Sequence, residues 1–325
     1  MSLDTSQLKV LVIVGPTASG KSALAMELAR RHSGEIISAD SMQVYRGMDI
    51  GTAKPTPEER AQIPHHMLDL VEPGAEYSIA QFQQQGREVV ADIAARGKLP
   101  LVVGGSGLYV RALIDDLELP EASKSAKVRA ELEAKIAAEG LPALWDELYQ
   151  VDPETALRID RHNPRRVIRA MELWLETGIK PSQQDSGAFD RPPCSIYNAA
   201  LTGLFVRREA LYAAIEARAQ TMIAQGLLEE TRELIERGVS HESQALQALG
   251  YKQLVPCLKG KYSLEEALRL IKRDTRRFAK RQYTWFKADP RISWLETEQY
   301  QDLCKLAEAA WQQAQKAWRQ SESVT

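Results

Sequence analysis

The chain has 325 residues, a formal net charge of −2 and 44% hydrophobic residues. That length is too great for one small core and favours an α/β domain with a smaller domain inserted or appended. The near-neutral charge argues against a uniformly basic nucleic-acid-binding protein, although it leaves room for local basic patches.

Targeting and cysteine signals indicate a cytoplasmic protein. The N-terminus lacks the charged and apolar regions of a signal peptide, and no apolar run is long enough to span a bilayer. Cys194, Cys257 and Cys304 form no C-x-x-C pair, so we expect reduced thiols rather than a metal site or a disulfide framework. No spare apolar face is obvious in the sequence, which favours a monomer.

The first chemical motif is a glycine loop at residues 15–22. It follows an apolar run over residues 10–14 and precedes a helix-forming run over residues 23–29. The spacing fits G-x-x-x-x-G-K-[ST], the phosphate-binding P-loop, in which backbone N–H groups and a helix N-terminus face an oxyanion. Lys21 is expected to neutralise phosphate charge, and the Ser22 hydroxyl is expected to ligate Mg²⁺. The loop consists of Gly15, Pro16, Thr17, Ala18, Ser19, Gly20, Lys21 and Ser22.

Residues 9–115 alternate strand and helix patterns, which predicts a parallel sheet. A short strand over residues 35–38 ends just before Asp40, and ligand-facing groups of open α/β sheets lie beyond the carboxyl ends of strands. Asp40 is therefore a candidate acid or base beside the loop, and the alternative is that it caps a helix. A buried strand over residues 99–103 ends in glycines and Ser106 instead of an acid, which argues against a motor ATPase.

Two charged helical regions favour contact with a polyanion. Residues 116–199 have the pattern of a helical insertion, which gathers five arginines against Asp160 alone inside their span. Residues 264–287 form a long amphipathic pattern, with an apolar stripe for the core and seven cations facing Asp274 alone. For both regions the alternative is a solvated charged face. The arginines of the insertion are Arg158, Arg161, Arg165, Arg166 and Arg169.

Together these motifs resemble those of one family, the tRNA dimethylallyltransferases, also called tRNA isopentenyltransferases. The resemblance spans nearly the whole chain in the right order, and its block over residues 38–55 is far more specific than the P-loop. Two positions depart from the family. Ser106 stands where a threonine is frequent, and Lys252 stands where arginine is usual and could form a bidentate fork that lysine cannot. The matching segments are residues 15–22, 38–55, 64–66, 103–109, 163–170 and 276–282.

The resemblance implies transfer of a dimethylallyl group from dimethylallyl diphosphate to N6 of the adenosine that follows the tRNA anticodon on its 3′ side. It implies that the P-loop and Mg²⁺ hold the diphosphate and that Asp40 is the general base on the flipped-out adenine, with Thr17 and Arg218 completing the catalytic set. It further implies contacts with tRNA by Asp40, Ser41, Met42, Gln43, Ser106, Arg129, Pro164, Arg165, Arg166, Val167, Ile168, Gln247, Ala248, Leu249, Gly250, Tyr251 and Lys252.

The expected fold is α/β, a P-loop NTPase-like parallel sheet flanked by helices with an inserted all-helical domain. The catalytic core is expected over residues 1–115 and 200–325, and the insertion over residues 116–199 is expected to clamp the anticodon stem. Two alternatives stay open. One is a small-molecule kinase of the nucleoside or shikimate type, which the arginine-rich insertion disfavours. The other is a non-catalytic RNA-binding module, which the intact Lys21, Ser22 and Asp40 disfavour.

Overall fold

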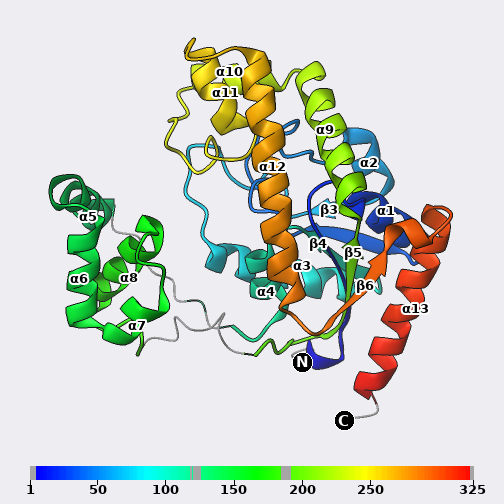
Figure 1. Cartoon of the computed structure of the whole chain (residues 1–325). Coiled ribbons are helices and arrows are strands. Elements are labelled where there is room, and N and C mark those ends of the chain that lie inside the picture. The colour runs from blue at the N-terminus through cyan, green and yellow to red at the C-terminus, as the bar shows by residue number, and fades with distance from the viewer. Residues whose placement is uncertain (1–4, 118, 120–125, 184–191, 323–325) are drawn as a thin grey trace. The chain divides into compact units, whose positions relative to one another are not determined.

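The computed structural model divides into two compact units (Figure 1). It describes residues 5–117, 119, 126–183 and 192–322. The core unit comprises Met1–Asp116 and Cys194–Thr325, and the inserted unit comprises Leu117–Pro193. The sequence pattern places the insertion over residues 116–199, whereas the chain is back in the core unit from Cys194 onward.

Six parallel strands form one sheet in the core unit, which confirms the predicted fold class. The strands are β1 (Lys9–Val14), β2 (Gly34–Ser38), β3 (His65–His66), β4 (Leu99–Gly104), β5 (Asn198–Phe205) and β6 (Ile292–Glu296), in the order β3-β2-β4-β1-β5-β6. Residues 10–14 of β1 are fully buried, and burial on both faces explains why this run is continuously apolar. Because the strands are parallel, their carboxyl ends meet at one edge of the sheet.

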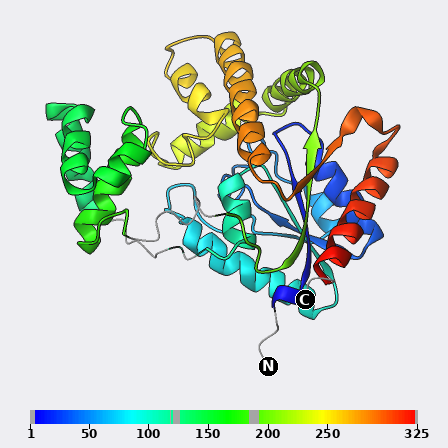
Figure 2. The ribbon, with the colours of Figure 1, turned by 60° about the horizontal axis from the view of Figure 1, so that its bottom comes forward.

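Helices cover both faces of this sheet (Figure 2). They are α1 (Lys21–Arg31), α2 (Pro57–Gln62), α3 (Ile79–Ala95), α4 (Gly107–Ile114), α9 (Arg208–Ala224), α10 (Leu227–Glu236), α11 (Tyr251–Leu258), α12 (Leu264–Lys287) and α13 (Leu303–Glu322), with short 3₁₀ turns η1 (Thr5–Gln7) and η3 (Thr297–Gln299). Leu11 and Ile13 of β1 share a core with α1 and α13. Val10 and Val12 point to the other face, into a core with α3, α4, α11 and α12.

One predicted helix is confirmed, because α12 spans the predicted residues 264–287. Ser78 caps α3 with a reciprocal capping box. Gly226 separates α9 from α10, because it adopts a left-handed conformation with φ 102°. The sequence pattern missed α2 and strand β6. No helix among the described residues is both long and apolar enough to cross a membrane.

Helices joined by turns make up the described part of the inserted unit. Its helices are α5 (Ala126–Glu139), α6 (Leu141–Val151), α7 (Pro153–Arg158) and α8 (Pro164–Thr177), of which α7 was not predicted. Leu144, Leu148, Val167 and Met171 are at most 2% exposed and form the centre of its own apolar core. Buried Asp152 caps α7 and also accepts a hydrogen bond from the Ser182 N–H. The unit therefore has the packing of a small helical domain.

A buried carboxylate marks the place where the chain leaves the core unit and returns to it. Asp115 is fully buried, accepts hydrogen bonds from Arg111 at 2.8 Å and from Arg291 at 2.6 Å, and forms an isolated antiparallel bridge with Ser195. The Ile196 N–H donates to the Ile114 carbonyl at 2.9 Å in the same bridge. The segment that leaves the core unit thus bonds the segment that returns to it, and Asp115 also bonds Arg291, the residue just before β6.

Replacing Asp115 by alanine should destabilise the core unit strongly, because Arg111 and Arg291 would each lose a buried carboxylate partner, and Arg291 would keep only Asp289 among the described carboxylates. Breaking one side of a buried ion pair costs about 3–5 kcal/mol. Urea unfolding of the variant should show this loss at unchanged m-value. Exposed Asp116 is the matched control, and D116A should stay within about 0.5 kcal/mol of the wild type. Equal stability of D115A and D116A would contradict a stabilising role for the ion pairs of Asp115.

Candidate active site

The glycine loop after β1 has the backbone conformation of an anion cradle. Gly15, Ala18 and Gly20 have positive φ angles of 146°, 63° and 87°. A side chain at Gly15 would meet the Leu204 carbonyl oxygen at 3.0 Å, so that position has little room for one. Gly20 precedes α1 and no side chain caps the helix, which leaves its first N–H groups available to an anion.

Three polar side chains of this loop have different surroundings. The Ser19 hydroxyl is buried and has no hydrogen-bond partner among the described residues. Ser22, in the first turn of α1, is exposed. The Lys21 ammonium donates to the Pro16 carbonyl oxygen at 2.5 Å. The loop therefore holds one cation whose ammonium bonds its own backbone and, besides the hydroxyl of Thr17, two serine hydroxyls that can receive a ligand.

Asp40 follows β2, and its electrostatic neighbours are Lys21 of the loop and Arg218 of α9. Burial and, to a smaller extent, the positive charge of Arg218 lower the pKa of Lys21 to about 7, while the charge of Asp40 opposes the shift. Burial raises the pKa of Asp40, against the Met42 N–H and the two cations. Burial also lowers the pKa of Arg218, and Asp40 again opposes it. The structure thus brings together one predicted base and two predicted cations.

The alternative role of Asp40 as a helix cap is wrong. No helix begins within residues 41–56, and Asp40 Oδ1 instead accepts the Met42 N–H at 2.9 Å in a local turn. Next to it, the Ser106 hydroxyl accepts the Ser41 N–H at 3.3 Å. A side chain at Gly104 would meet the Ala39 carbonyl oxygen at 2.2 Å, so the glycine permits β2 and β4 to end in close contact.

One residue without a predicted role joins two parts of this site. Gln282 of α12 is 6% exposed, and its side chain hydrogen-bonds both the Thr17 N–H and the Gly105 carbonyl oxygen. The sequence signal was present, because Gln282 ends the segment 276–282 that resembles the family. A single glutamine gives no indication of its partners 265 and 177 residues away.

The loop after Asp40 is held by one of its own polar side chains and by a carboxylate from a distant helix. Gln43 accepts a hydrogen bond from the Ser38 hydroxyl and donates to the carbonyls of Thr52 and Ala53. The Glu230 carboxylate of α10, for which no role was predicted, accepts three consecutive N–H groups, those of residues 49–51. These hydrogen bonds within the protein hold the loop in one conformation without a ligand.

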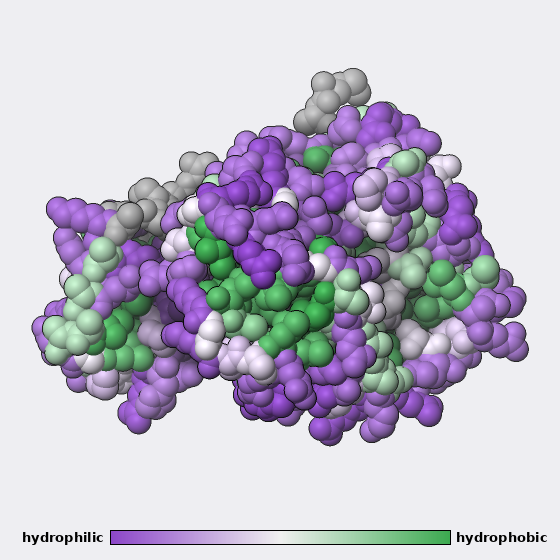
Figure 3. Space-filling view, turned by 90° about the horizontal axis from the view of Figure 1, so that it is seen from above, coloured by the Kyte–Doolittle hydropathy of each residue, from purple (hydrophilic) through white to green (hydrophobic). Residues whose placement is uncertain are grey.

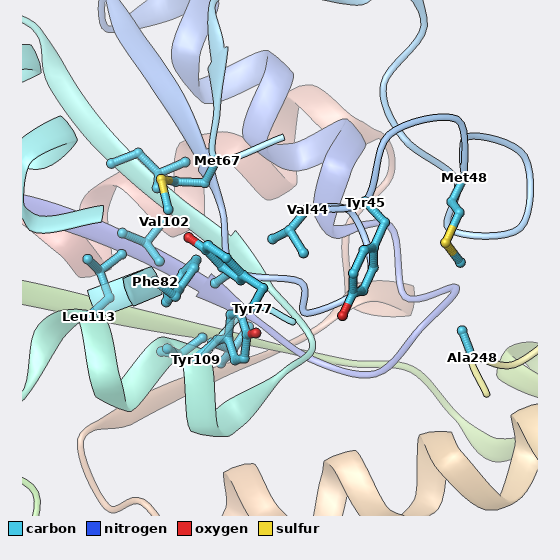
Figure 4. Packing of buried hydrophobic residues seen from close by; sticks show 14 of the residues in the cluster. Val44, Tyr45, Met48, Met67, Tyr77, Phe82, Val102, Tyr109, Leu113 and Ala248 are labelled. Atoms are coloured by element: carbon cyan, nitrogen blue, oxygen red, sulfur yellow. The ribbon is translucent and has the colours of Figure 1, made fainter. Parts of the chain in front are cut away.

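Aromatic side chains pack beneath the loop (Figure 4). Tyr77 and Tyr109 lie beside Phe82, with the Phe82 and Tyr109 ring centroids 4.2 Å apart. Tyr45 is 1% exposed, and its hydroxyl has no partner among the described residues. Burial raises the pKa of Tyr109, and the charges of Tyr45, Tyr77 and Asp40 add smaller contributions, so the Asp40 carboxylate acts on this cluster electrostatically.

The residues implied in tRNA contact fall into exposed and buried sets. In the core unit, Gln247 and Lys252 are exposed, whereas Tyr251 is buried under Gly51 and donates its hydroxyl to Glu230. Tyr251 thus supports the loop, and any surface contact of this segment falls to its neighbours. Met42 and Leu249 are half-buried, and Ala248 and Gly250 are buried.

In the inserted unit, α8 presents its arginines and buries its apolar residues. Pro164, Arg165 and Arg166 are exposed and the two arginines form no ion pair with described residues, whereas Val167 and Ile168 belong to the core of the unit. Arg129 lies against two carboxylates, Glu133 at 3.2 Å and Glu172 at 3.5 Å. Two exposed positive charges that form no ion pair with described residues therefore lie at the start of α8.

The basic face of α12 carries more acids than the sequence pattern suggested. Asp274 does pair with Arg273, but Glu266 pairs with Arg269 and Glu216 of α9 pairs with Arg276. The expectation of seven cations facing Asp274 alone is wrong, because folding brings Glu216 across from another helix.

Comparison with known proteins identifies the family of this arrangement. The "IPP transferase" family matches residues 43–289, and the "Isopentenyl transferase" family matches residues 8–70. The tRNA dimethylallyltransferase of Carboxydothermus hydrogenoformans is 47% identical over 290 residues, covering 89% of this chain and 92% of that protein. The chain belongs to the tRNA dimethylallyltransferase family. That of Pelotomaculum thermopropionicum is 46% identical over 308 residues, covering 95% and 97%.

Solved tRNA isopentenyltransferases have the same fold. The full-length tRNA isopentenylpyrophosphate transferase of Bacillus halodurans is 38% identical and superposes with a TM-score of 0.70 over 97% of this chain and 100% of that chain. A eukaryotic dimethylallyltransferase, solved acting on tRNA, is 29% identical and superposes with a TM-score of 0.77 over 93% of this chain and 78% of that chain. The chain is therefore an enzyme of the prenyltransferase class, as its motifs predicted.

Proposed function

We propose that this enzyme transfers a dimethylallyl group from dimethylallyl diphosphate to N6 of the adenosine that follows the anticodon on its 3′ side. The observation that carries this proposal is the meeting of Asp40, Lys21 and Arg218 beside a phosphate cradle. One carboxylate and two cations are the groups that such a transfer needs. The printed names of the relatives, tRNA dimethylallyltransferases, support the same substrates.

The leaving group is the diphosphate. When the allylic C–O bond breaks, its electron pair goes to the diphosphate oxygen, and the loop amides, Lys21 and Arg218 stabilise the added negative charge. A fixed donor of this kind contributes about 3–4 kcal/mol to transition-state stabilisation. Thr17 lies in the same loop, and we assign its hydroxyl to the positioning of the diphosphate or of Asp40.

The nucleophile is the exocyclic amine of adenine, whose lone pair is delocalised into the purine ring. An allylic cation is stabilised by resonance, so the C–O bond can break ahead of N–C bond formation in a loose transition state. The new bond joins N6 to the allylic carbon, and the amine proton passes to the Asp40 carboxylate. A raised pKa makes Asp40 a better proton acceptor than an exposed aspartate, provided that it is ionised.

Magnesium fits the loop as a partner of the diphosphate. Ser22 offers an exposed hydroxyl in the turn that carries Lys21, and the part of the chain that the structure describes holds no group of three or more His, Cys, Asp or Glu that could bind a metal. Mg²⁺ commonly takes few protein ligands and completes its coordination with phosphate oxygens and water. We assign Ser22 as a protein ligand of an ion that neutralises the bound diphosphate.

The acceptor adenine has to leave its stack to reach Asp40, which costs less in a loop than in a duplex. Figure 3 shows apolar side chains gathered in the middle of one face of the core unit, with polar residues around them. Such a surface suits an unstacked base and a prenyl chain. We assign the exposed residues among the implied contacts to the tRNA, with the inserted unit as the clamp on the anticodon stem, and we expect the protein to act as a monomer.

Replacing Arg165 and Arg166 together by alanine should weaken tRNA binding and flatten its salt dependence. Each lost phosphate contact lowers the slope of log K against log salt by about 0.7–0.9, so the double variant should lose about 1.5. Filter binding at several salt concentrations measures this slope. The matched control removes two exposed cations of α13, Lys305 and Arg319, and should leave the slope unchanged. A wild-type slope in R165A/R166A would remove the inserted unit from the clamp.

A transfer assay tests the proposed reaction. Purified enzyme, Mg²⁺ and labelled dimethylallyl diphosphate are incubated with unmodified bulk tRNA, and label on RNA is compared with a control lacking tRNA. Label that digests to N6-prenyl adenosine is the expected result. Absence of label together with ATP-dependent phosphorylation of a small acceptor would reject the proposal in favour of a kinase.

A further inference from the structure

The Gln282 side chain of α12 bridges the glycine loop after β1 and the turn after β4. Its Oε1 accepts the Thr17 N–H at 2.9 Å, and its Nε2 donates to the Gly105 carbonyl oxygen at 2.8 Å. Thr17 follows β1 and Gly105 follows β4, which are neighbouring strands. The diphosphate cradle and the turn before Ser106 are thus tied to the same point of one helix.

The two partners determine which end of the Gln282 amide is the oxygen and which is the nitrogen. A backbone N–H can only donate and a carbonyl can only accept, so a single orientation of the Gln282 amide satisfies both. A side chain at Gly105 would place its Cβ 2.3 Å from Nε2. The hydrogen bond from Gln282 to residue 105 therefore needs a glycine at that position.

We propose that Gln282 is a positioning residue, which holds the diphosphate loop in its binding conformation before the ligand arrives. The loop contains Ala18, a non-glycine residue at φ 63°, and such a conformation persists only where surrounding contacts enforce it. Without the amide, the Thr17 N–H is released and the ligand must order the loop itself, which lowers affinity. The part of this inference that concerns donor binding rests on the proposed function.

The test measures binding of inorganic pyrophosphate with Mg²⁺ by calorimetry, in the absence of tRNA. Q282L should bind about 10-fold more weakly, the effect of one lost hydrogen bond of about 1.4 kcal/mol. Q282E keeps an acceptor for Thr17 but turns a negative charge toward the loop, so it should bind more weakly than Q282L. Hydrogen exchange of the Thr17 amide should be faster in Q282L, which reports on the loop without any ligand.

Gly105→Ala should disrupt the same hydrogen bonds of Gln282 without changing Gln282 itself. The added methyl group should expel the flexible end of Gln282, so G105A should reproduce the loss seen in Q282L. The double variant should bind no more weakly than either single one, because both remove the same bond. In the transfer assay Q282L should raise KM for the prenyl donor and leave KM for tRNA unchanged, a split that a general loss of stability does not produce.

Gln83 supplies the control. It lies on α3 and donates a side-chain hydrogen bond to the Ala112 carbonyl oxygen at 2.9 Å, away from the loop. Q83L should lose some stability and keep wild-type affinity for pyrophosphate. The inference is overturned if Q282L and G105A bind pyrophosphate within about twofold of the wild type, or if Q83L loses as much affinity as they do. A wild type that binds pyrophosphate but does not label tRNA would instead reject the proposed reaction.

Discussion

Replacing Asp40 by asparagine lowers kcat for prenyl transfer by about 10²–10⁴-fold, the usual contribution of a positioned general base. Asparagine has the same shape and can still accept the Met42 N–H through its amide oxygen, so the local turn is retained. It cannot take a proton from the adenine amine. The loss should therefore appear in kcat, while the Kd for tRNA stays within about threefold of the wild type.

The pH profile gives a second readout for Asp40. Burial raises the pKa of this carboxyl above its usual value of 3.8, and only the ionised form accepts a proton. Activity of the wild type should therefore fall on the acid side through that raised pKa, and D40N should lack this limb. Exposed Asp92 on α3 is a control, and D92N should keep both rate and profile. A D40N variant with near wild-type kcat would reject Asp40 as the base.

Lys21→Ala should reduce kcat/KM for the prenyl donor by about 10²–10³-fold, the effect of removing one charge-stabilising donor. The ammonium has only the Pro16 carbonyl as a hydrogen-bonding partner among the described residues, so its main role is toward a ligand. K21R keeps the charge but replaces a compact ammonium with a planar fork, and should recover part of the loss. Binding of inorganic pyrophosphate, measured by calorimetry, should follow the same order.

The lowered pKa of Lys21 adds a proton signature. With a pKa of about 7, a share of the side chain is neutral in the free enzyme at neutral pH. A bound anion favours the charged form of Lys21 and raises this pKa, so Lys21 should take up a fraction of a proton between pH 7 and 8 when pyrophosphate binds. Calorimetry in two buffers of different ionisation enthalpy measures the net proton exchange, to which pyrophosphate also contributes. The wild type should take up that fraction more than K21A, and equal exchange by the two proteins would assign it to groups other than Lys21.

Local pattern was sufficient for the elements that carry the site. The loop at residues 15–22 was predicted from its spacing and flanking runs. The place of Asp40 just after a strand predicted a position beside that loop but left a helix cap as the alternative, and the role as base came from the resemblance to the family. The span of α12 followed from its apolar periodicity. These features are encoded by residues a few positions apart, because strand and helix geometry repeats every two to four residues.

The polar contacts that hold the site were not predictable in the same way. Gln282 meets Thr17 and Gly105, Glu230 receives three N–H groups of residues 49–51, and Asp115 pairs with Arg291. Each contact joins residues far apart in the chain. Tyr251 shows the same limit, since its segment resembles a tRNA contact whereas the side chain is buried beneath Gly51.

The sequence by itself determined the place of the glycine loop, the span of α12, and which residue types stand just beyond β1, β2 and β4. Only the tertiary structure decided which of those polar groups lose water and which partners they then meet. The physical reason is that a pKa near 7 for Lys21, or a fixed amide at Gln282, depends on burial and on charges brought in from other elements. The spacing of residues along the chain does not indicate which side chains become buried or which distant charges they meet.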